Sequence, residues 1–578
     1  MIGRRGAVLV PVDTIPRLLN QGRKMTAIRG ATWALSTILM LGCATGGAGN
    51  EAGAASDARL PRTRAELTGY TETSHYSDVI AFLDSLQTLG APIWRGSIGT
   101  SFEGRTLPLV VLSRPRVSTP EEARRLGRPV VYVQGNIHAG EVEGKEALLM
   151  LIRDLAFARG PSVLDSVILL ANPIYNADGN ERFAAQAKNR ASQNGPELVG
   201  TRANAQGFDL NRDYVKAEAP ETRASLAAFT EWHPDVFVDL HTTDGSYHGY
   251  ALTYAPSLNP AAFFGGVYAQ DSLLPELRQR MRERHSFEVF DYGNFNDEYG
   301  GDPTDTVKQG WYTYDGRPRY GTNYFGLRGR IGILSEAYSH DPFERRVRST
   351  YAFVREILSL TAERATEIRD LERRADSTIV AWGRDPQRAR PIPLRSRMTT
   401  RPFDEVVVHE DLVRTGDSSR TQPGVPRGLR RTGHFRSERM KVYDRFEPTL
   451  ERRPPAAYVL AASDSAAIRV LAEHGVSASR LSVDCEARVQ RFTIDSVVAS
   501  RRAFQGHNEV RLEGSWSEDR ETIAAGSYVV PVSQAMGLVA FYLLEPESDD
   551  GLATWNYFDP RLEPGVRFPV ARVMLPLP

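Results

Sequence analysis

The chain has 578 residues, of which 41% are hydrophobic and 25% are charged, and its formal net charge at pH 7 is zero. This length exceeds one compact core and indicates about two or three domains. The balanced charge argues against a dedicated nucleic-acid binder. With only two cysteines, Cys43 and Cys485, the chain has no disulfide framework.

The N-terminal segment has the order of an export signal. Basic residues precede the apolar stretch ATWALSTILMLG, and Cys43 follows it directly. The stretch is short for a transmembrane helix and typical of a secretory signal. The cysteine after Leu-Gly resembles a bacterial lipobox, in which Cys43 carries a lipid anchor, and a plain signal peptide cut within residues 44–55 is the alternative. We expect a signal at 1–43, a flexible linker at 44–60, and a protein exported to the cell envelope or periplasm, or secreted.

Short apolar runs alternate with helical patterns from about residue 60 to 365. Strands are predicted at 130–135, 166–173, 235–242 and 330–338. Helices are predicted at 143–158, 220–233, 272–285 and, closing the domain, 350–375. This alternation indicates an α/β domain at residues 61–375 with a mostly parallel central sheet, whose ligands bind at the carboxyl ends of the strands.

The second half of the chain has a different composition. Residues 376–455 are dense in Arg, Pro, Gly, Ser and Thr, which predicts linkers and exposed loops. A smaller α+β or β-rich accessory domain is predicted at 456–578, opening with a strand and a helix that ends at Gly475. Strand-like runs follow at 488–495, 507–516, 526–532 and 537–544. The acidic stretch LLEPESDDGLATWNYFD is interpreted as a solvated turn, with a calcium site as the alternative.

Candidate metal ligands follow two of the predicted strands. His138 and Glu141 lie three residues apart on the turn after 130–135, and His241 ends the strand at 235–242. A catalytic zinc ion needs three such ligands and an open fourth position. The His-x-x-Glu pair alone is weak evidence, because a polar turn explains it equally well. Three candidate ligands at one edge of a parallel sheet favour zinc.

Other polar residues at this edge suit peptide chemistry. Arg202 and the Asn211-Arg212 pair lie in GTRANAQGFDLNRD, where a guanidinium fork and an amide suit a carboxylate or a developing oxyanion. A polar loop held by internal salt bridges is the alternative. Glu336 ends an apolar strand, where it is either a general base beside zinc-activated water or the partner of an arginine such as Arg330.

Together, the segments HAGE, NADG, GTRANAQGFDLNRD, DLHT and ILSEAY resemble the zinc carboxypeptidase family of carboxypeptidase A over about residues 65–365. The resemblance implies an α/β/α sandwich with a mixed, mostly parallel sheet. It implies one Zn²⁺ per chain, bound by His138, Glu141 and His241. It also implies that Glu336 is the general base and that Arg202, rather than Arg190, stabilises the oxyanion.

The resemblance further implies that Asn211 and Arg212 hold the terminal carboxylate of a peptide. A tyrosine of the family closes over the substrate, and the candidates here are Tyr312, Tyr314, Tyr320 and Tyr324, of which Tyr314 and Tyr324 are assigned to substrate binding. Asp213 stands where many members have asparagine, which predicts a different pocket at that position.

The leading interpretation is a large, exported bacterial zinc metallocarboxypeptidase acting on peptides with a free C-terminal carboxylate. An amidase or deacylase of the same clan, acting on cell-wall peptides or acylated amino acids, is an alternative. A non-catalytic envelope binding protein is another, but it predicts a missing ligand or base, and all four residues are present.

Overall fold

The structure is a computed structural model that describes residues 60–243, 245–295, 304–416, 422 and 424–575. The predicted signal, Cys43 and the linker to residue 59 lie outside the described residues. Leu60–Pro578 form one compact unit. Within the described ranges, no helix has the length and apolarity needed to cross a membrane.

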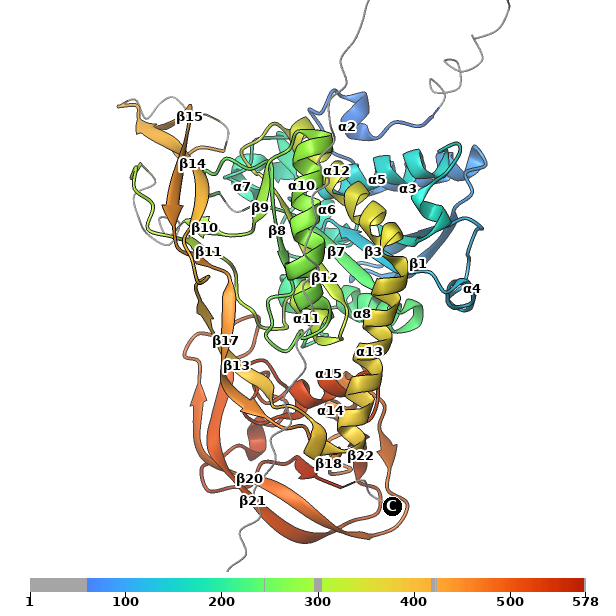
Figure 1. Ribbon diagram of the computed structural model, residues 1–578, viewed down its shortest axis with the longest axis vertical. Coiled ribbons are helices and arrows are strands. Elements are labelled where there is room, and N and C mark those ends of the chain that lie inside the picture. Colours follow the sequence, from blue (N-terminus) through green and yellow to red (C-terminus); the bar gives the residue numbers. More distant parts are fainter. Residues whose placement is uncertain (1–59, 244, 296–303, 417–421, 423, 576–578) are drawn as a thin grey trace, which may run out of the picture. The chain divides into compact units, whose positions relative to one another are not determined.

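An eight-stranded sheet forms the centre of the N-terminal half (Figure 1). Its strands, in spatial order, are β1 (Trp94–Thr100), β2 (Thr106–Leu112), β4 (Ile168–Asn172), β3 (Val130–Gly135), β7 (Val236–Thr242), β12 (Ile331–Ala337), β8 (Leu252–Pro256) and β9 (Val289–Asp291). The central run β4-β3-β7-β12 and the pair β8-β9 are parallel, whereas β1-β2, β2-β4 and β12-β8 are antiparallel. The predicted mixed, mostly parallel sheet is confirmed.

Helices cover both faces of this sheet, because its central strands are apolar on both sides. Val131 and Val133 of β3 pack in one core cluster with α5 (Glu143–Ala156), α10 (Leu274–His285) and α12 (Phe343–Glu363). The intervening Tyr132 packs in a second cluster with α8 (Pro220–Trp232) and α11 (Gly321–Leu327). Successive side chains of a strand point to opposite faces, and the result is a helix–sheet–helix sandwich.

The predicted helix at 350–375 is two helices. The backbone breaks at Arg364, with φ −107° and ψ 22°, between α12 and α13 (Ala365–Arg384). The predicted domain boundary at residue 375 therefore falls inside α13. The far end of α13 packs against α15 (Gly537–Leu544), and a Cβ added at Gly383 would lie 2.1 Å from the Ser533 nitrogen. Helix α13 thus connects the sandwich closely to the C-terminal residues.

The range 376–455 is predicted as linkers and loops. Its described residues instead carry five strands: β13 (Ile392–Thr399), β14 (Glu405–Arg414), β15 (Leu429–Met440), β16 (Val442–Tyr443) and β17 (Arg445–Arg452). β14 pairs with β15 and β13 with β17, both antiparallel. Most residues of β15 are exposed. Strands held by backbone pairing rather than burial lack an apolar alternation, and composition alone does not reveal them.

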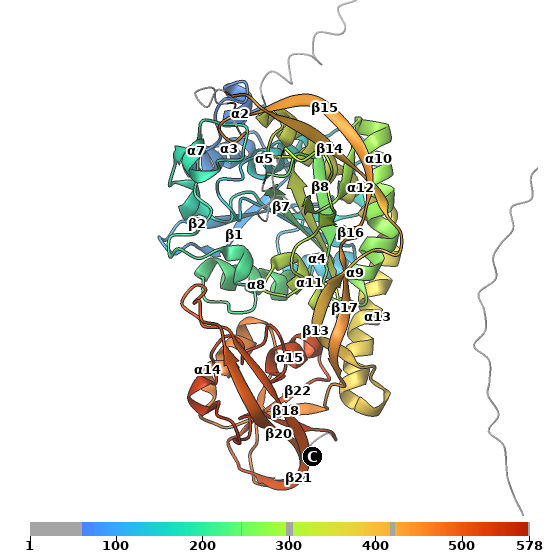
Figure 2. The ribbon, with the colours of Figure 1, turned by 90° about the vertical axis from the view of Figure 1, so that its left-hand side faces the viewer.

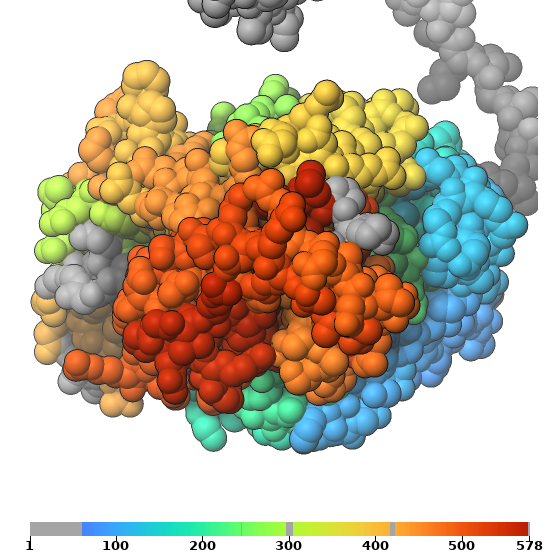
Figure 3. All heavy atoms as spheres, turned by 90° about the horizontal axis from the view of Figure 1, so that it is seen from below, coloured from blue at the N-terminus to red at the C-terminus, as the bar shows by residue number. Residues whose placement is uncertain are grey.

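The C-terminal module, residues 456–575, contains a six-stranded antiparallel sheet, as predicted for a β-rich region. Its strands, in spatial order, are β19 (Ser479–Arg480), β22 (Tyr528–Pro531), β18 (Ala457–Leu460), β23 (Ala571–Val573), β20 (Cys485–Ala499) and β21 (Val510–Ile523). Figure 2 shows the long pair β20 and β21, and helix α14 (Ser465–Glu473) follows β18. Orange and red residues of the module occupy the centre of the view from below (Figure 3).

One predicted strand in this module is wrong. The run GLVAFYLL at 537–544 forms helix α15, and every residue of it is buried. A short run that is apolar on all sides carries neither a helical nor an alternating pattern, so periodicity does not separate a buried helix from a buried strand.

Candidate metal centre

The turn after β3 and the end of β7 bring three ligand side chains together. The ligand atoms of His138, Glu141 and His241 lie within 4.8 Å of one another, and all three residues are buried. His138 Nδ1 and His241 Nδ1 are 3.3 Å apart. Each lies 3.0 Å from a different oxygen of Glu141. Four donor atoms thus converge on one point at the carboxyl edge of the sheet.

Local structure explains this convergence. Asn136 directly follows β3 with φ 68°, which turns the chain away from the strand direction. Helix α5 then starts close to β7, because a Cβ at Gly144 would lie 2.7 Å from Leu240 Cβ. The short turn between β3 and α5 therefore holds His138 and Glu141 beside the end of β7.

In each histidine, the ring nitrogen that faces away from the ligand cluster, Nε2, lies close to a carboxylate. His138 Nε2 is 3.0 Å from Asp209 Oδ1, and His241 Nε2 is 3.0 Å from Asp239 Oδ2. A metal-binding histidine characteristically donates its other N–H to such a group, which leaves the facing nitrogen free for the ion. Two imidazole nitrogens and a carboxylate, each oriented in this way, fit Zn²⁺. The sequence pattern did not single out Asp209, although it stands two residues before Asn211.

The electrostatics of the cluster favour a cation. Burial raises the pKa of Glu141, but the neighbouring His138 and Arg190 outweigh burial and hold it well below its usual value. Burial lowers the pKa of His241, whereas Asp239 and Glu141 overcome this effect and raise it well above its ordinary value. Ionised carboxylates therefore concentrate negative charge around the two imidazoles.

The two candidate arginines have different surroundings. Arg190 is buried, and it donates to Glu141 Oε1 and to the carbonyl oxygens of Thr242 and Thr243, each at 3.0 Å. It thus ties Glu141 to the end of β7. Arg202 donates to Asp209 Oδ2 at 2.9 and 3.0 Å, and its side chain is 38% exposed. Of the two arginines, Arg202 has the more exposed side chain.

Asn211 and Arg212, on the segment that also carries Asp209, lie close to the metal ligands. Asn211 Nδ2 is 3.4 Å from His241 Nε2, and Asn211 Oδ1 accepts from the Gly321 N–H at 2.9 Å. The Arg212 guanidinium lies 3.9 Å from the centre of the Tyr320 ring. Its nearest carboxylate among the described residues is Asp209, at 4.0 Å. Among the described residues, no carboxylate therefore forms a close bidentate pair with Arg212, so its guanidinium can bind a carboxylate from a ligand.

Glu336 lies at the same edge. It is the register partner of His241 on the adjacent parallel strand, and it is 8% exposed. Arg330 lies before the opposite end of β12 and pairs with Asp376 at 2.9 Å. Arg330, the arginine named in the alternative interpretation, is therefore not the partner of Glu336, because the length of β12 separates them.

The tyrosines of residues 311–324 divide into separate environments. The Tyr314 hydroxyl is hydrogen-bonded to Thr322 Oγ1 at 2.9 Å. Burial raises the pKa of Tyr314, and the nearby Glu336 carboxylate adds to this effect. The Tyr324 hydroxyl lies 2.7 Å from His474 Nδ1, fully buried. The assignment of Tyr324 to substrate binding is wrong, because its hydroxyl is used inside the core.

Tyr320 and Tyr312 complete this set. Tyr320 lies under Arg212, as described above, and its ring centre is 5.0 Å from that of Tyr314. Tyr312 stacks on Tyr443, with ring centres 4.3 Å apart. Tyr320, rather than Tyr324, therefore joins Tyr314 beside the proposed substrate-binding residues.

Two further expectations are corrected. Asp213 is buried and accepts hydrogen bonds from Lys216 Nζ at 3.0 Å and the Ala219 N–H at 2.8 Å, so it supports the start of α8 rather than lining a pocket. The acidic stretch near 545–550 is neither solvated nor a group of free ligands. Three of its four carboxylates are paired with arginines, Glu545 with Arg572, Glu547 with Arg452, and Asp550 with Arg319, and Asp549 accepts from the Tyr542 hydroxyl.

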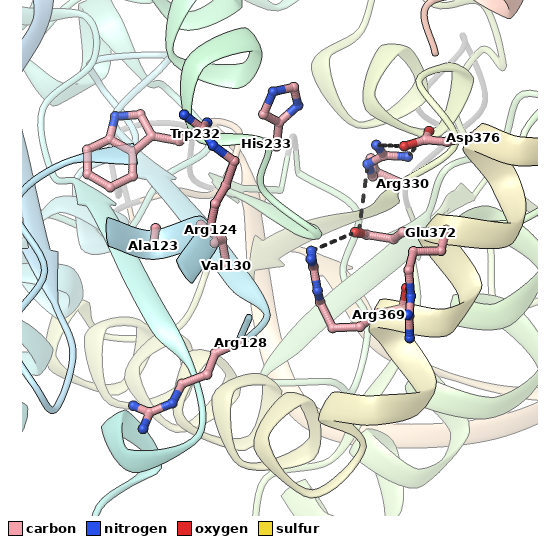
Figure 4. Close-up of a pocket in the computed structure, with 11 residues that line it drawn as sticks. Ala123, Arg124, Arg128, Val130, Trp232, His233, Arg330, Arg369, Glu372 and Asp376 are labelled. Carbon is pink, nitrogen blue, oxygen red and sulfur yellow. Dashed lines mark hydrogen bonds and ion pairs between the residues drawn. The ribbon is translucent and has the colours of Figure 1, made fainter. Parts of the chain in front are cut away.

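A separate cavity lies at the opposite edge of the sheet (Figure 4). It is lined in part by Val130 at the start of β3 and by Arg330 before β12. Two of its five arginines form ion pairs at 2.9 Å, Arg330 with Asp376 and Arg369 with Asp235. This cavity is remote from the ligand cluster, which lies at the other ends of the same strands.

The comparisons with known proteins agree with this site. Residues 79–317 match the model of the family described as zinc carboxypeptidase. Carboxypeptidase 2 of Trichophyton rubrum is 23% identical over 502 residues, covering 82% of this chain and 81% of its own. Carboxypeptidase M of Mus musculus is 29% identical over 215 residues, covering 35% of this chain and 44% of its own.

Among solved structures, a metallo-carboxypeptidase from Burkholderia cenocepacia aligns with a TM-score of 0.36 and 20% identity, covering 51% of this chain and 70% of the other. The family match includes all three ligands, and their geometry is that of a catalytic zinc site. The chain is therefore a zinc-dependent metallocarboxypeptidase whose residues 79–317 match the zinc carboxypeptidase family.

Proposed function

We propose that the enzyme removes the C-terminal residue of peptides with a free carboxylate, with Glu336 as general base, Arg202 as oxyanion donor, and Asn211 and Arg212 as carboxylate anchor. The observation that carries this proposal is the register of β7 and β12, which sets Glu336 beside the ligand His241. Arg202 and Arg212 approach the same cluster through Asp209.

Zinc, when bound, supplies a Lewis acid that polarises a carbonyl and lowers the pKa of water. Glu336 accepts a proton from the attacking water and returns it to the leaving amine nitrogen. Arg202 donates hydrogen bonds to the carbonyl oxygen as negative charge develops on it. Its own position is secured by Asp209, which also orients His138.

Arg212 recognises the terminal carboxylate through a bidentate pair, which selects the end of a peptide over an internal bond. The Tyr320 ring, 3.9 Å from the guanidinium, keeps the fork oriented by a cation–π contact. Tyr314, whose ring centre lies 5.0 Å from that of Tyr320, contacts the residue being released.

The test of this proposal is Glu336→Gln. The amide keeps the size of the side chain but cannot accept the proton, so kcat falls by about 10²–10⁴-fold while bound zinc is retained. Turnover of N-acylated dipeptides and metal analysis of the purified protein check both statements. Glu356→Gln, at a buried glutamate of α12 paired with His285 at 2.8 Å, is the matched control and keeps normal turnover. Unchanged kcat in Glu336→Gln rejects the assignment.

We also propose that the enzyme is exported by a bacterium and anchored through a lipid on Cys43. The support is the basic, apolar and small-residue order that ends in LGC. The two relatives described above come from a fungus and a mouse and lend no support to a bacterial origin. Incorporation of a labelled fatty acid during expression in a bacterium, lost in Cys43→Ser, is the expected result. Equal labelling of both proteins, or labelling of neither, contradicts the anchor.

A further inference from the structure

The C-terminal module contacts both segments that carry the proposed carboxylate anchor. One segment, residues 213–218, directly follows Arg212. The other, residues 315–321, contains Tyr320, whose ring lies against Arg212. Each segment is bound by side chains from residues 505–557 of the module, as the contacts below show.

Arg319 makes the first contact. Asp550 accepts from the Arg319 main-chain N–H at 2.7 Å and from its Nε at 3.0 Å. Glu509 accepts from Arg319 Nη1 at 2.6 Å. Trp555 donates its indole N–H to Asp550 at 2.9 Å, and its ring centre lies 4.5 Å from the guanidinium. Arg319 and Asp550 are 4% and 0% exposed, so this is a buried, multiply bonded charge pair.

This pair determines where the next two residues lie. Because Asp550 binds the main chain of Arg319 as well as its side chain, it holds the backbone that leads into α11. Tyr320, the next residue, supports Arg212. Gly321, the residue after that, donates its N–H to Asn211 Oδ1 at 2.9 Å. One carboxylate of the C-terminal module therefore binds the residue that directly precedes Tyr320 and Gly321, which contact Arg212 and Asn211.

The second contact is at Lys216. Its ammonium is buried, and it donates to Asp213 Oδ1 and to Gln505 Oε1, each at 3.0 Å. Its Nζ also lies 5.2 Å from the centre of the Trp555 ring. Trp555 thus stands between Lys216 and Arg319. The module therefore supports Arg212 in two ways, through Lys216 on the segment that follows it and through Arg319, which precedes Tyr320.

We propose that the C-terminal module is a structural wall of the carboxylate-binding pocket and that Asp550 is a positioning residue for Arg212. This inference rests on the proposed role of Arg212. It assigns to the module a part in recognising the free carboxylate of the peptide. Asp550 acts through Arg319 and Tyr320 and touches no reacting atom.

The experiment compares Asp550→Asn with Glu545→Gln in the full-length, zinc-loaded enzyme. Glu545 is the matched control because it forms a buried pair with Arg572 in the same module, with Arg572 Nε donating to it at 2.8 Å. Loss of orientation at Arg212 raises KM for N-acylated dipeptides by about 10-fold in Asp550→Asn, while kcat changes by less than about 2-fold. Glu545→Gln lowers the unfolding temperature without this KM change.

Two further variants keep the proposal testable if Asp550→Asn does not fold. Glu509→Gln removes the negative charge that pairs with Arg319 Nη1, and Arg319→Lys removes the bidentate guanidinium. Both variants are expected to raise KM in the same way. Normal KM in these variants overturns the proposal, as does an equal KM change in Glu545→Gln.

Arg212→Ala, measured in parallel, separates this inference from the proposed function. If Arg212→Ala raises KM and the Asp550 and Glu509 variants do not, the role of the module is wrong and the carboxylate anchor stands. If Arg212→Ala leaves KM unchanged, the anchor itself is wrong, and the positioning role is overturned with it.

Discussion

At the scale of single residues, Asp209 connects the metal ligands with the substrate-binding arginines. Its two oxygens contact His138 and Arg202, and Arg212 lies 4.0 Å away. Burial raises the pKa of Asp209, but His138, Arg212 and Arg202 together hold it well below its usual value. The ionised Asp209 carboxylate therefore orients His138 and attracts both Arg202 and Arg212.

This arrangement predicts the effect of Asp209→Asn. The amide no longer accepts strongly from His138 Nε2, so the imidazole loses orientation and basicity, and zinc affinity falls by about 10–100-fold. Competition with a chelator at constant pH measures the change. Asp213→Asn, four residues further along, is the control, because Asp213 supports α8 and touches neither histidine. Equal zinc affinity in wild type and Asp209→Asn contradicts the role.

At the scale of secondary-structure elements, the sequence pattern predicted the parallel strands and their helices well. β3, β4, β7 and β12 all lie within the predicted runs, because strands buried on both faces are continuously apolar and bounded by polar turns. The pattern failed for GLVAFYLL and for β13 to β17. The conformation of GLVAFYLL depends on its burial on all sides, and that of the strands depends on the partner strand with which each one pairs.

The junction between α13 and the C-terminal module predicts the effect of Gly383→Ala. Glycine to alanine inside a helix ordinarily stabilises it by about 1 kcal/mol. At Gly383 the new Cβ would meet backbone atoms of Val532 and Ser533 at 2.4 and 2.1 Å, which cannot move independently. Overpacking of this kind costs about 1–3 kcal/mol, so the clash prevails.

We therefore expect a lower unfolding temperature for Gly383→Ala in calorimetry. Ser377→Ala, at an exposed position of the same helix, is the control and leaves the transition unchanged or slightly higher. A transition for Gly383→Ala equal to or above that of wild type shows that α13 and the module are packed less tightly than described.

At the scale of the whole molecule, Asp549 in the acidic stretch 545–550 predicts a pH-dependent stability. Burial raises the pKa of Asp549 to about 7, and neighbouring Asp550 adds to this, against the hydrogen bond from Tyr542 at 2.6 Å. In the unfolded chain the pKa is near the ordinary aspartate value. The folded state thus binds more protons between these two values, and Asp549 lowers stability progressively as pH rises from about 4 to about 7.

Asp549→Asn removes this dependence. The variant is expected to unfold at a higher temperature than wild type at pH 8, with the difference shrinking as pH falls below 7 and vanishing near pH 4. Thermal unfolding of both proteins across this range measures it. A difference that is the same at pH 8 and pH 5, or that has the opposite sign at pH 8, contradicts the raised pKa.

The sequence by itself determined the four central parallel strands, the zinc ligands and the position of Glu336. These follow from local order: an apolar strand places the next residues at the carboxyl edge, and parallel neighbours share that edge. Only the tertiary structure decided that Tyr320 rather than Tyr324 faces Arg212, that Asp209 supports His138, and that Asp550 binds Arg319. Asp550 and Arg319 are 231 residues apart, and no local pattern of apolar and polar residues records which buried carboxylate will meet which arginine.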